Sequence, residues 1–101
     1  MARDNIYTLI EKAVSEMTGT SETYYKEKLR NGLQATYEKH TDELKAGPDS
    51  KALAKLTDEA IQIAHEQIPQ MALRMYTMNP IKTITVYTEV YDILEKMSKL
   101  K

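Results

Sequence analysis

Apolar residues recur at steps of three and four along almost the whole chain, and this spacing constrains the fold more than any other feature. In the first such stretch, Ile6, Leu9, Ile10, Ala13 and Val14 fall on one side of a helix. The 101 residues include only three glycines and three prolines, so few positions interrupt the pattern. We therefore expect an all-α protein whose first helix covers about residues 5–18.

Turn-forming residues divide the rest of the pattern into three further helices. Thr20 or Ser21 can cap a polar second helix, and residues 47–50, Gly-Pro-Asp-Ser, end that helix and cap the next one. Asn79 precedes a proline and so ends the third helix. Because short connections make consecutive helices antiparallel neighbours, the sequence predicts an antiparallel four-helix bundle in a single domain, residues 1–101.

Two interior residues depart from good helix-forming sequence. Gly32 lies inside the second predicted helix, where glycine costs about 1 kcal/mol relative to alanine. It either marks a close approach between helices or is merely tolerated. Pro69 lies inside the third, where it removes a backbone donor and clashes with the preceding turn. We expect the third helix to be kinked or broken near Pro69, at about residues 65–68.

The last predicted helix, over about residues 82–99, has a wide apolar face. Its residues 82–88 also have a strand-like composition. A single short segment cannot build a sheet, and the chain offers no other strand candidate, so we interpret it as a helix. The residues that define this helix are Ile84, Tyr87, Tyr91, Leu94 and Met97, with Val86, Val90, Ile93 and Leu100 beside them.

Residues 69–80, between two prolines, place three methionines at helical spacing. Methionine fills irregular gaps in cores and also forms adaptable binding surfaces, so Met71, Met75 and Met78 suit either a core or an interface. Met71 and Met75 continue the apolar face that starts at Leu53, and we expect them to be mostly buried.

Tyrosine supplies all seven aromatic side chains, because phenylalanine and tryptophan are absent. A tyrosine buries its ring and keeps its hydroxyl at water or a hydrogen-bond partner, which suits both core margins and interfaces. We expect the interruption at Pro69 to expose Tyr76 and Met78 beside the last helix. The candidate partner-binding residues are therefore Met71, Met75, Tyr76, Met78, Tyr87 and Tyr91.

Residues that carry catalysis or bind metals are scarce. The two histidines are His40 and His65, and only His40 has a carboxylate, Glu43, at helical spacing. A di-metal helical bundle needs a Glu-x-x-His pair on each of two helices. Cysteine is absent, and neither a nucleophile elbow nor a glycine-rich phosphate loop occurs. We therefore expect no enzyme activity, no cofactor and no metal.

Charge is balanced, with 14 basic against 15 acidic residues and a formal net charge of -1. The basic residues alternate with carboxylates, whereas a DNA-binding domain concentrates positive charge on one face. We therefore expect no nucleic-acid partner. No stretch approaches the roughly 20 apolar residues of a membrane span, and the N-terminus does not read as a secretory signal. A cytoplasmic location is the prediction.

Several features of the chain together indicate a family. They are a first helix ending near Met17, a longer polar second helix, the turn at residues 47–50, the helix start at residues 51–56 (Lys-Ala-Leu-Ala-Lys-Leu) and a closing helix around residues 87–91 (Tyr-Thr-Glu-Val-Tyr). In these features the chain resembles the enterocin A-type bacteriocin immunity proteins, which are cytoplasmic four-helix bundles of about this length. The resemblance implies protection of a producer cell by engagement of a bacteriocin-bound membrane receptor from inside, with the C-terminal part setting specificity.

The sequence thus predicts a non-enzymatic helical-bundle protein that acts by binding another protein or itself. One alternative is a bacteriocin immunity protein, which would contact a membrane receptor peripherally. A second is a small dimeric regulator that binds nucleic acid, and a third is a structural or secretion-related component. Self-association requires an apolar patch left over once the helices have packed.

Overall fold

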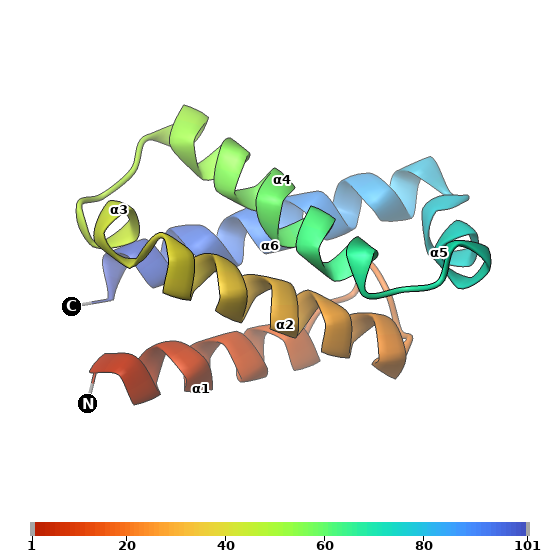
Figure 1. Cartoon of the computed structure of the whole chain (residues 1–101), viewed down its shortest axis with the longest axis horizontal. Helices are drawn as coiled ribbons and strands as arrows, with labels where there is room; N and C mark the ends of the chain where they lie inside the picture. Colours follow the sequence, from red (N-terminus) through yellow and green to blue (C-terminus); the bar gives the residue numbers. More distant parts are fainter. Residues whose placement is uncertain (1, 101) are drawn as a thin grey trace.

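Six helices make up the described part of the chain, residues 2–100, in this computed structural model (Figure 1); side chains are described from residue 5 onward. Their bounds are α1 Ala2–Ser15, α2 Thr23–Lys39, α3 Thr41–Lys45, α4 Ser50–Glu66, α5 Gln70–Thr77 and α6 Pro80–Lys99. The all-α prediction is confirmed. A bundle of four helices is not, because the short helices α3 and α5 are added to the four long ones.

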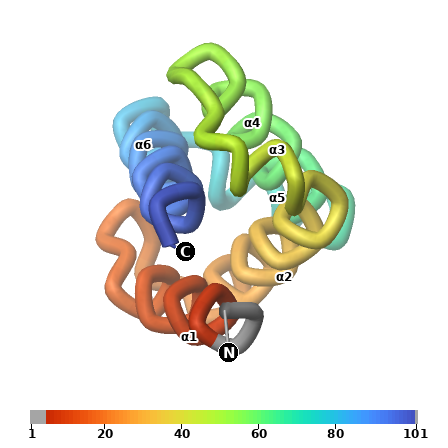
Figure 2. The backbone as a smooth tube through the Cα atoms, turned by 90° about the vertical axis from the view of Figure 1, so that its left-hand side faces the viewer, coloured from red at the N-terminus to blue at the C-terminus, as the bar shows by residue number. Residues whose placement is uncertain are grey.

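The long helices α1, α2, α4 and α6 surround one core. Successive long helices run in opposite directions along the molecule (Figure 1), and each packs on the next, with α6 also contacting α1 (Figure 2). The start of α1 and the end of α6 lie at one end of the molecule, whereas α5 lies at the opposite end (Figure 1). The most deeply buried large side chains are Ile10, Leu29, Leu33, Leu44, Leu94 and Val90.

Gly32 lies where α2 and α4 pack most closely. A Cβ atom added to Gly32 would overlap the carbonyl oxygen of Ala60 on α4. Ala60 and Ala64 are themselves fully buried and contribute small side chains to the same contact. The interpretation of Gly32 as a point of close helix approach is therefore confirmed, since any larger residue would push the two helices apart.

The second predicted helix is divided at His40, which leaves helical geometry with φ -122° and ψ 33°. This bend directs the His40 ring toward α4, where its Nε2 lies 2.5 Å from the Glu59 Oε2. Lys39 adds an ion pair to the same carboxylate at 3.2 Å. Burial alone would raise the pKa of Glu59, but the hydrogen bonds from Lys39 and His40 outweigh it and lower that pKa. Beyond the bend, α3 buries Leu44 against α6.

The third predicted helix is broken rather than kinked at Pro69. It begins at a side-chain cap, because the Asp49 Oδ1 accepts the Ala52 N–H at 2.8 Å. It ends as α4 at Glu66, and Pro69 then adopts extended backbone angles, φ -56° and ψ 142°, before α5 begins. The interruption expected near this proline is confirmed, and it separates two helices with different neighbours.

The prediction that Met71 and Met75 continue the core face is wrong. Both side chains are exposed, because the extended residues before α5 interrupt the helical phase that α4 had established. The side of α5 that packs against the body of the molecule carries Ala72, Leu73 and Tyr76 instead. The methionine stripe consequently faces away from the core.

Helix α6 starts earlier than predicted and packs by one stripe of its apolar residues. The Asn79 Oδ1 accepts the N–H groups of Ile81 and Lys82 at 3.0 and 3.2 Å, and Pro80 occupies the first helical turn. Ile84, the first residue of the apolar series predicted for this helix, is exposed beside α5 at the end of the molecule. The buried stripe is Val86, Val90, Ile93, Leu94 and Met97, with Tyr87 and Tyr91 half-buried at its edge.

Candidate functional site

Five large apolar side chains on α5 and the beginning of α6 are exposed to solvent. We name this set the methionine face: Met71 (86% exposed), Met75 (76%), Met78 (78%), Ile81 (76%) and Ile84 (66%). The next most exposed large apolar side chain among the described residues is Tyr24, at 41%. An exposed apolar set of this size marks an interaction site more often than it occurs without a role.

The five side chains follow one another along the surface. Met71, Met75 and Met78 occupy one stripe, because residues three or four positions apart are neighbours on a helix. Ile81 comes three residues after Met78, so their Cα atoms are within about 11 Å of each other. Ile84 lies one turn beyond Ile81 on α6. The tight turn that joins the two stripes is fixed by the Asn79 side-chain cap.

Charged residues are nearly absent from this region. Residues 67–88 contain two, Arg74 and Lys82, and no carboxylate, although 29% of the whole chain is charged. Both side chains are exposed. The centres of protein interfaces are depleted of Asp, Glu and Lys and enriched in Met, Arg and aromatic residues. The composition around the methionine face matches that trend.

Tyr76 attaches α5 to the rest of the molecule. Its ring stacks on Tyr25 of α2, with centroids 4.5 Å apart and planes at 8°. The Tyr25 hydroxyl lies 2.7 Å from the Nε2 of His65 on α4, so three helices meet in this column. The expectation that the interruption at Pro69 exposes both Tyr76 and Met78 holds for Met78 but not for Tyr76, which is half-buried and stacks on α2.

Burial sets the protonation of this column. It raises the pKa of Tyr25 to about 12, with Tyr76 adding to the shift, and it lowers the pKa of His65. A lowered pKa favours the neutral imidazole, whose unprotonated Nε2 can accept a hydrogen bond from the Tyr25 hydroxyl. The column serves as a structural connection between α2, α4 and α5.

Tyr87 and Tyr91 also pack against the body of the molecule. Tyr87 donates its hydroxyl to the carbonyl oxygen of Ala54 at 3.4 Å, which ties α6 to α4. Of the six candidate partner-binding residues, the structure thus brings Met71, Met75 and Met78 together at the surface and places the three tyrosines in intramolecular contacts. Sequence reasoning missed Ile81 and Ile84, although the scarcity of charge over residues 67–88 pointed to the segment that holds them.

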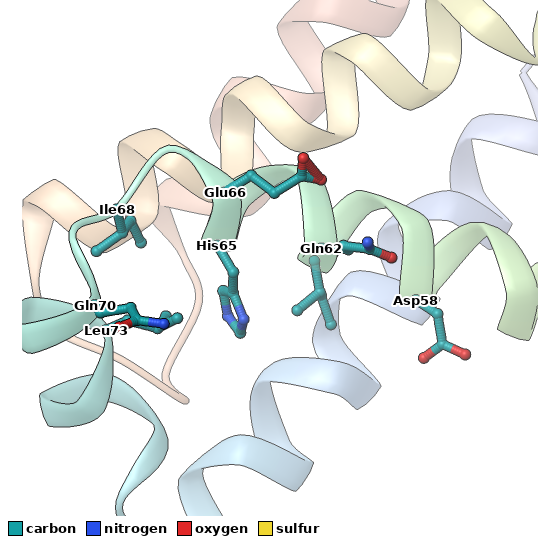
Figure 3. Close-up of a pocket in the computed structure, with 8 residues that line it drawn as sticks. Asp58, Gln62, His65, Glu66, Ile68, Gln70 and Leu73 are labelled. Atoms are coloured by element: carbon teal, nitrogen blue, oxygen red, sulfur yellow. The ribbon is translucent and has the colours of Figure 1, made fainter.

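A shallow hollow spans the Pro69 break, between the end of α4 and the start of α5 (Figure 3). Its volume is about 510 Å³, and its walls come from the last turns of α4 and the start of α5. His65 projects into it, with Asp58 and Glu66 at its polar edge. The His65 Nε2 lies 2.7 Å from the Tyr25 hydroxyl, so this nitrogen already takes part in a contact between α2 and α4. The hollow offers weaker support for a function than the exposed apolar set.

Within residues 2–100, no helix combines the length and the apolar character that crossing a membrane requires. The same residues bring together no cluster of three or more His, Asp or Glu side chains suited to a metal ion. Comparisons of the chain with known protein families, with curated proteins and with solved structures find no match.

Proposed function

We propose that this protein is a non-enzymatic docking module, and that the methionine face is the surface by which it binds a protein. The observation that carries the proposal is the exposure of five large apolar side chains on two consecutive helices. In this proposal the four long helices act as one rigid antiparallel bundle that presents α5 and the start of α6 at its end. The docking partner covers Met71, Met75, Met78, Ile81 and Ile84.

The energy available at this surface supports the proposal. Burying a methionine or isoleucine side chain contributes about 1.5–3 kcal/mol, so five such side chains that are two-thirds or more exposed offer roughly 5–10 kcal/mol. Association costs about 4–15 kcal/mol in lost freedom of movement. The apolar burial on both partners together can therefore exceed the cost of association. A single exposed leucine or methionine could not supply that much free energy.

A photo-crosslinking amino acid in place of Met75 tests whether the surface is occupied in cells that express the protein naturally. We expect one discrete covalent adduct, because a docked partner holds its side chains against the probe. The matched control carries the same probe in place of Ala35, an exposed residue of α2. Equal adducts from the two positions, or none from Met75, would reject a docking function for this surface.

We propose bacteriocin immunity as a second candidate function, favoured by the position of the exposed residues. The resemblance assigns specificity to the C-terminal part of the chain, and residues 71–84 lie in its last third. Under this function, expression of the protein would protect sensitive bacteria from a peptide encoded beside it. Met75→Glu would remove that protection while Ala35→Glu would keep it. Unprotected cells at normal expression of the wild-type protein would exclude the candidate.

A further inference from the structure

We propose that the occupant of the methionine face is a second copy of this chain, which packs the same five side chains against their own counterparts in a symmetric dimer. This inference rests on the proposed docking function and names its partner. It is carried by two observations on α5 and α6, the distribution of charge and the amount of apolar surface.

The two charged residues near the methionine face, Arg74 and Lys82, lie at its margin, where a symmetric contact tolerates them. In a two-fold dimer the same patch of each copy meets the other, so any charge at its centre faces a like charge. At 100° per residue, Arg74 lies about 60° from the middle of the methionine stripe on α5. Lys82 lies about 100° from Ile81 and about 160° from Ile84 around α6. Both positive side chains are therefore at the margin, and the centre of the face is uncharged.

An acidic partner is less well supported by the same residues. A surface that selects carboxylates needs cations interleaved with its apolar side chains. Here Arg74 is three residues after Met71 and four before Met78, at one edge of the stripe, and Lys82 lies on the side of α6 away from Ile84. The other neighbours that complete the surface are neutral residues such as Thr77, Asn79 and Thr88. Neutral polar residues can form the hydrogen-bonded margin of a contact between identical chains.

The apolar area is close to what a dimer needs. A standard interface covers about 800 Å² on each partner, and about 65% of a homodimer interface is apolar, which corresponds to roughly 500 Å². Five methionine and isoleucine side chains at these exposures present on the order of 400 Å². Methionine also adapts its shape, so two identical stripes can interdigitate without a preformed groove.

Sedimentation velocity of the full chain over about 1–200 μM tests the proposal, since mass action populates the dimer as concentration rises. We expect the mass to rise from 11.6 kDa toward twice that value.

The double variant Met75→Glu with Ile84→Glu would weaken the dimer at least about 100-fold, because it buries unpaired carboxylates. Ala35→Glu, which places a carboxylate on exposed α2, would leave the dimer unchanged. A wild-type chain that stays monomeric, or a dimer that the double variant does not weaken, would overturn the proposal.

A mixing experiment then tests the symmetry. The variant Met75→Lys with Ile84→Lys should be monomeric alone, like the Glu variant, and an equimolar mixture of the two should dimerise again through opposite charges. Far-UV circular dichroism of each variant confirms that the helices are intact. No dimer in the mixture would reject a face-to-face contact. An adduct with a different protein in the Met75 crosslinking experiment, together with a monomeric wild type, would keep the docking function and reject the second copy.

Discussion

Helices α4 and α5 each carry an apolar stripe, but the stripe of α4 is buried and that of α5 is exposed. They are separated by three residues, 67–69, and each concentrates its apolar side chains on one side. The stripe of α4 is buried between α2 and α6, whereas α5 has no buried residue and leaves its methionines in solvent. Amphipathic spacing therefore predicts that a helix has an apolar face but does not identify what covers that face.

The difference lies in the neighbours available at each position along the bundle. Helix α4 runs between the long helices α2 and α6, so its apolar face is enclosed (Figure 2). Helix α5 lies at the end of the molecule beside the start of α6, where the stack of Tyr76 on Tyr25 supplies its main aromatic anchor. The side of α5 that carries Met71 and Met75 consequently remains exposed to solvent, where another molecule can contact it.

Truncating one residue in each stripe should give the largest contrast. Leu56→Ala on α4 is expected to lower the free energy of unfolding by about 2–5 kcal/mol, because it opens a cavity in the core. Met75→Ala on α5 should change it by no more than about 0.5 kcal/mol, as for other surface positions. Urea unfolding at about 1 μM protein, which keeps self-association small, measures both. Similar losses from the two variants would contradict the comparison.

The contact of α4 with α2 can be broken from the other side, at Gly32. In an exposed helix, replacing glycine by alanine stabilises by about 1 kcal/mol. Here Gly32→Ala should instead destabilise by about 1–3 kcal/mol, because the new Cβ overlaps the Ala60 carbonyl and the helices must separate.

The matched control for Gly32 is Ala35→Gly on the exposed side of the same helix, with an expected loss of about 1 kcal/mol from propensity alone. Both variants are compared by urea unfolding at one temperature. A gain of stability in Gly32→Ala would mean that α2 and α4 pack less closely than described.

The sequence predicted those features that depend on local chemistry. The helical class, a helix cap within residues 47–50 and the interruption at Pro69 all follow from spacing, side-chain caps or backbone restrictions. For Gly32 the sequence left two interpretations open, and the packing of α2 on α4 decides between them. The division of the second helix at His40 was not predicted, because residues 38–41 contain no glycine or proline, and the contact of His40 with Glu59, nineteen residues away along the chain, leaves no local pattern.

The candidate site was predicted in part. Three of its five members, Met71, Met75 and Met78, were among the candidates, but their exposure depends on the direction that α5 takes after Pro69. The spacing of apolar residues does not predict that direction, because it depends on a tertiary contact, the stack of Tyr76 on Tyr25. The exposure of Ile84 was not predicted, because α6 has apolar residues on more than one side and only packing selects which of them are buried.

Removing the stack should detach α5 without unfolding α4. Tyr76→Ala is expected to cost about 1–2 kcal/mol, because it removes the aromatic pair and the partial burial of the ring. Amide hydrogens of residues 70–77 should then exchange faster with solvent while those of α4 keep their protection. Tyr7→Ala is a suitable comparison, since its edge-to-face contact with Tyr37 lies in α1 and α2. Equal acceleration in α4 and α5 would mean that the two helices unfold as one unit.

The smallest effect concerns pH, and it acts at the boundary between the two helices. Burial lowers the folded-state pKa of His65 from 6.5, so the unfolded chain binds a proton at a higher pH than the folded one. The stability that the neutral imidazole contributes is therefore present above pH 6.5 and is lost as pH falls through the lower folded-state pKa. The groups that face it are Tyr25 of α2, its hydrogen-bond partner, and Asp58 and Glu66, which line the same hollow on α4.

Urea unfolding of the wild type and of His65→Gln at several pH values from about 7.5 to 5 measures this effect. The difference in stability between the two proteins should shrink toward acid, because all other titrations are common to both. A difference that stays constant, or grows toward acid, would mean that the Tyr25–His65 contact favours the charged imidazole.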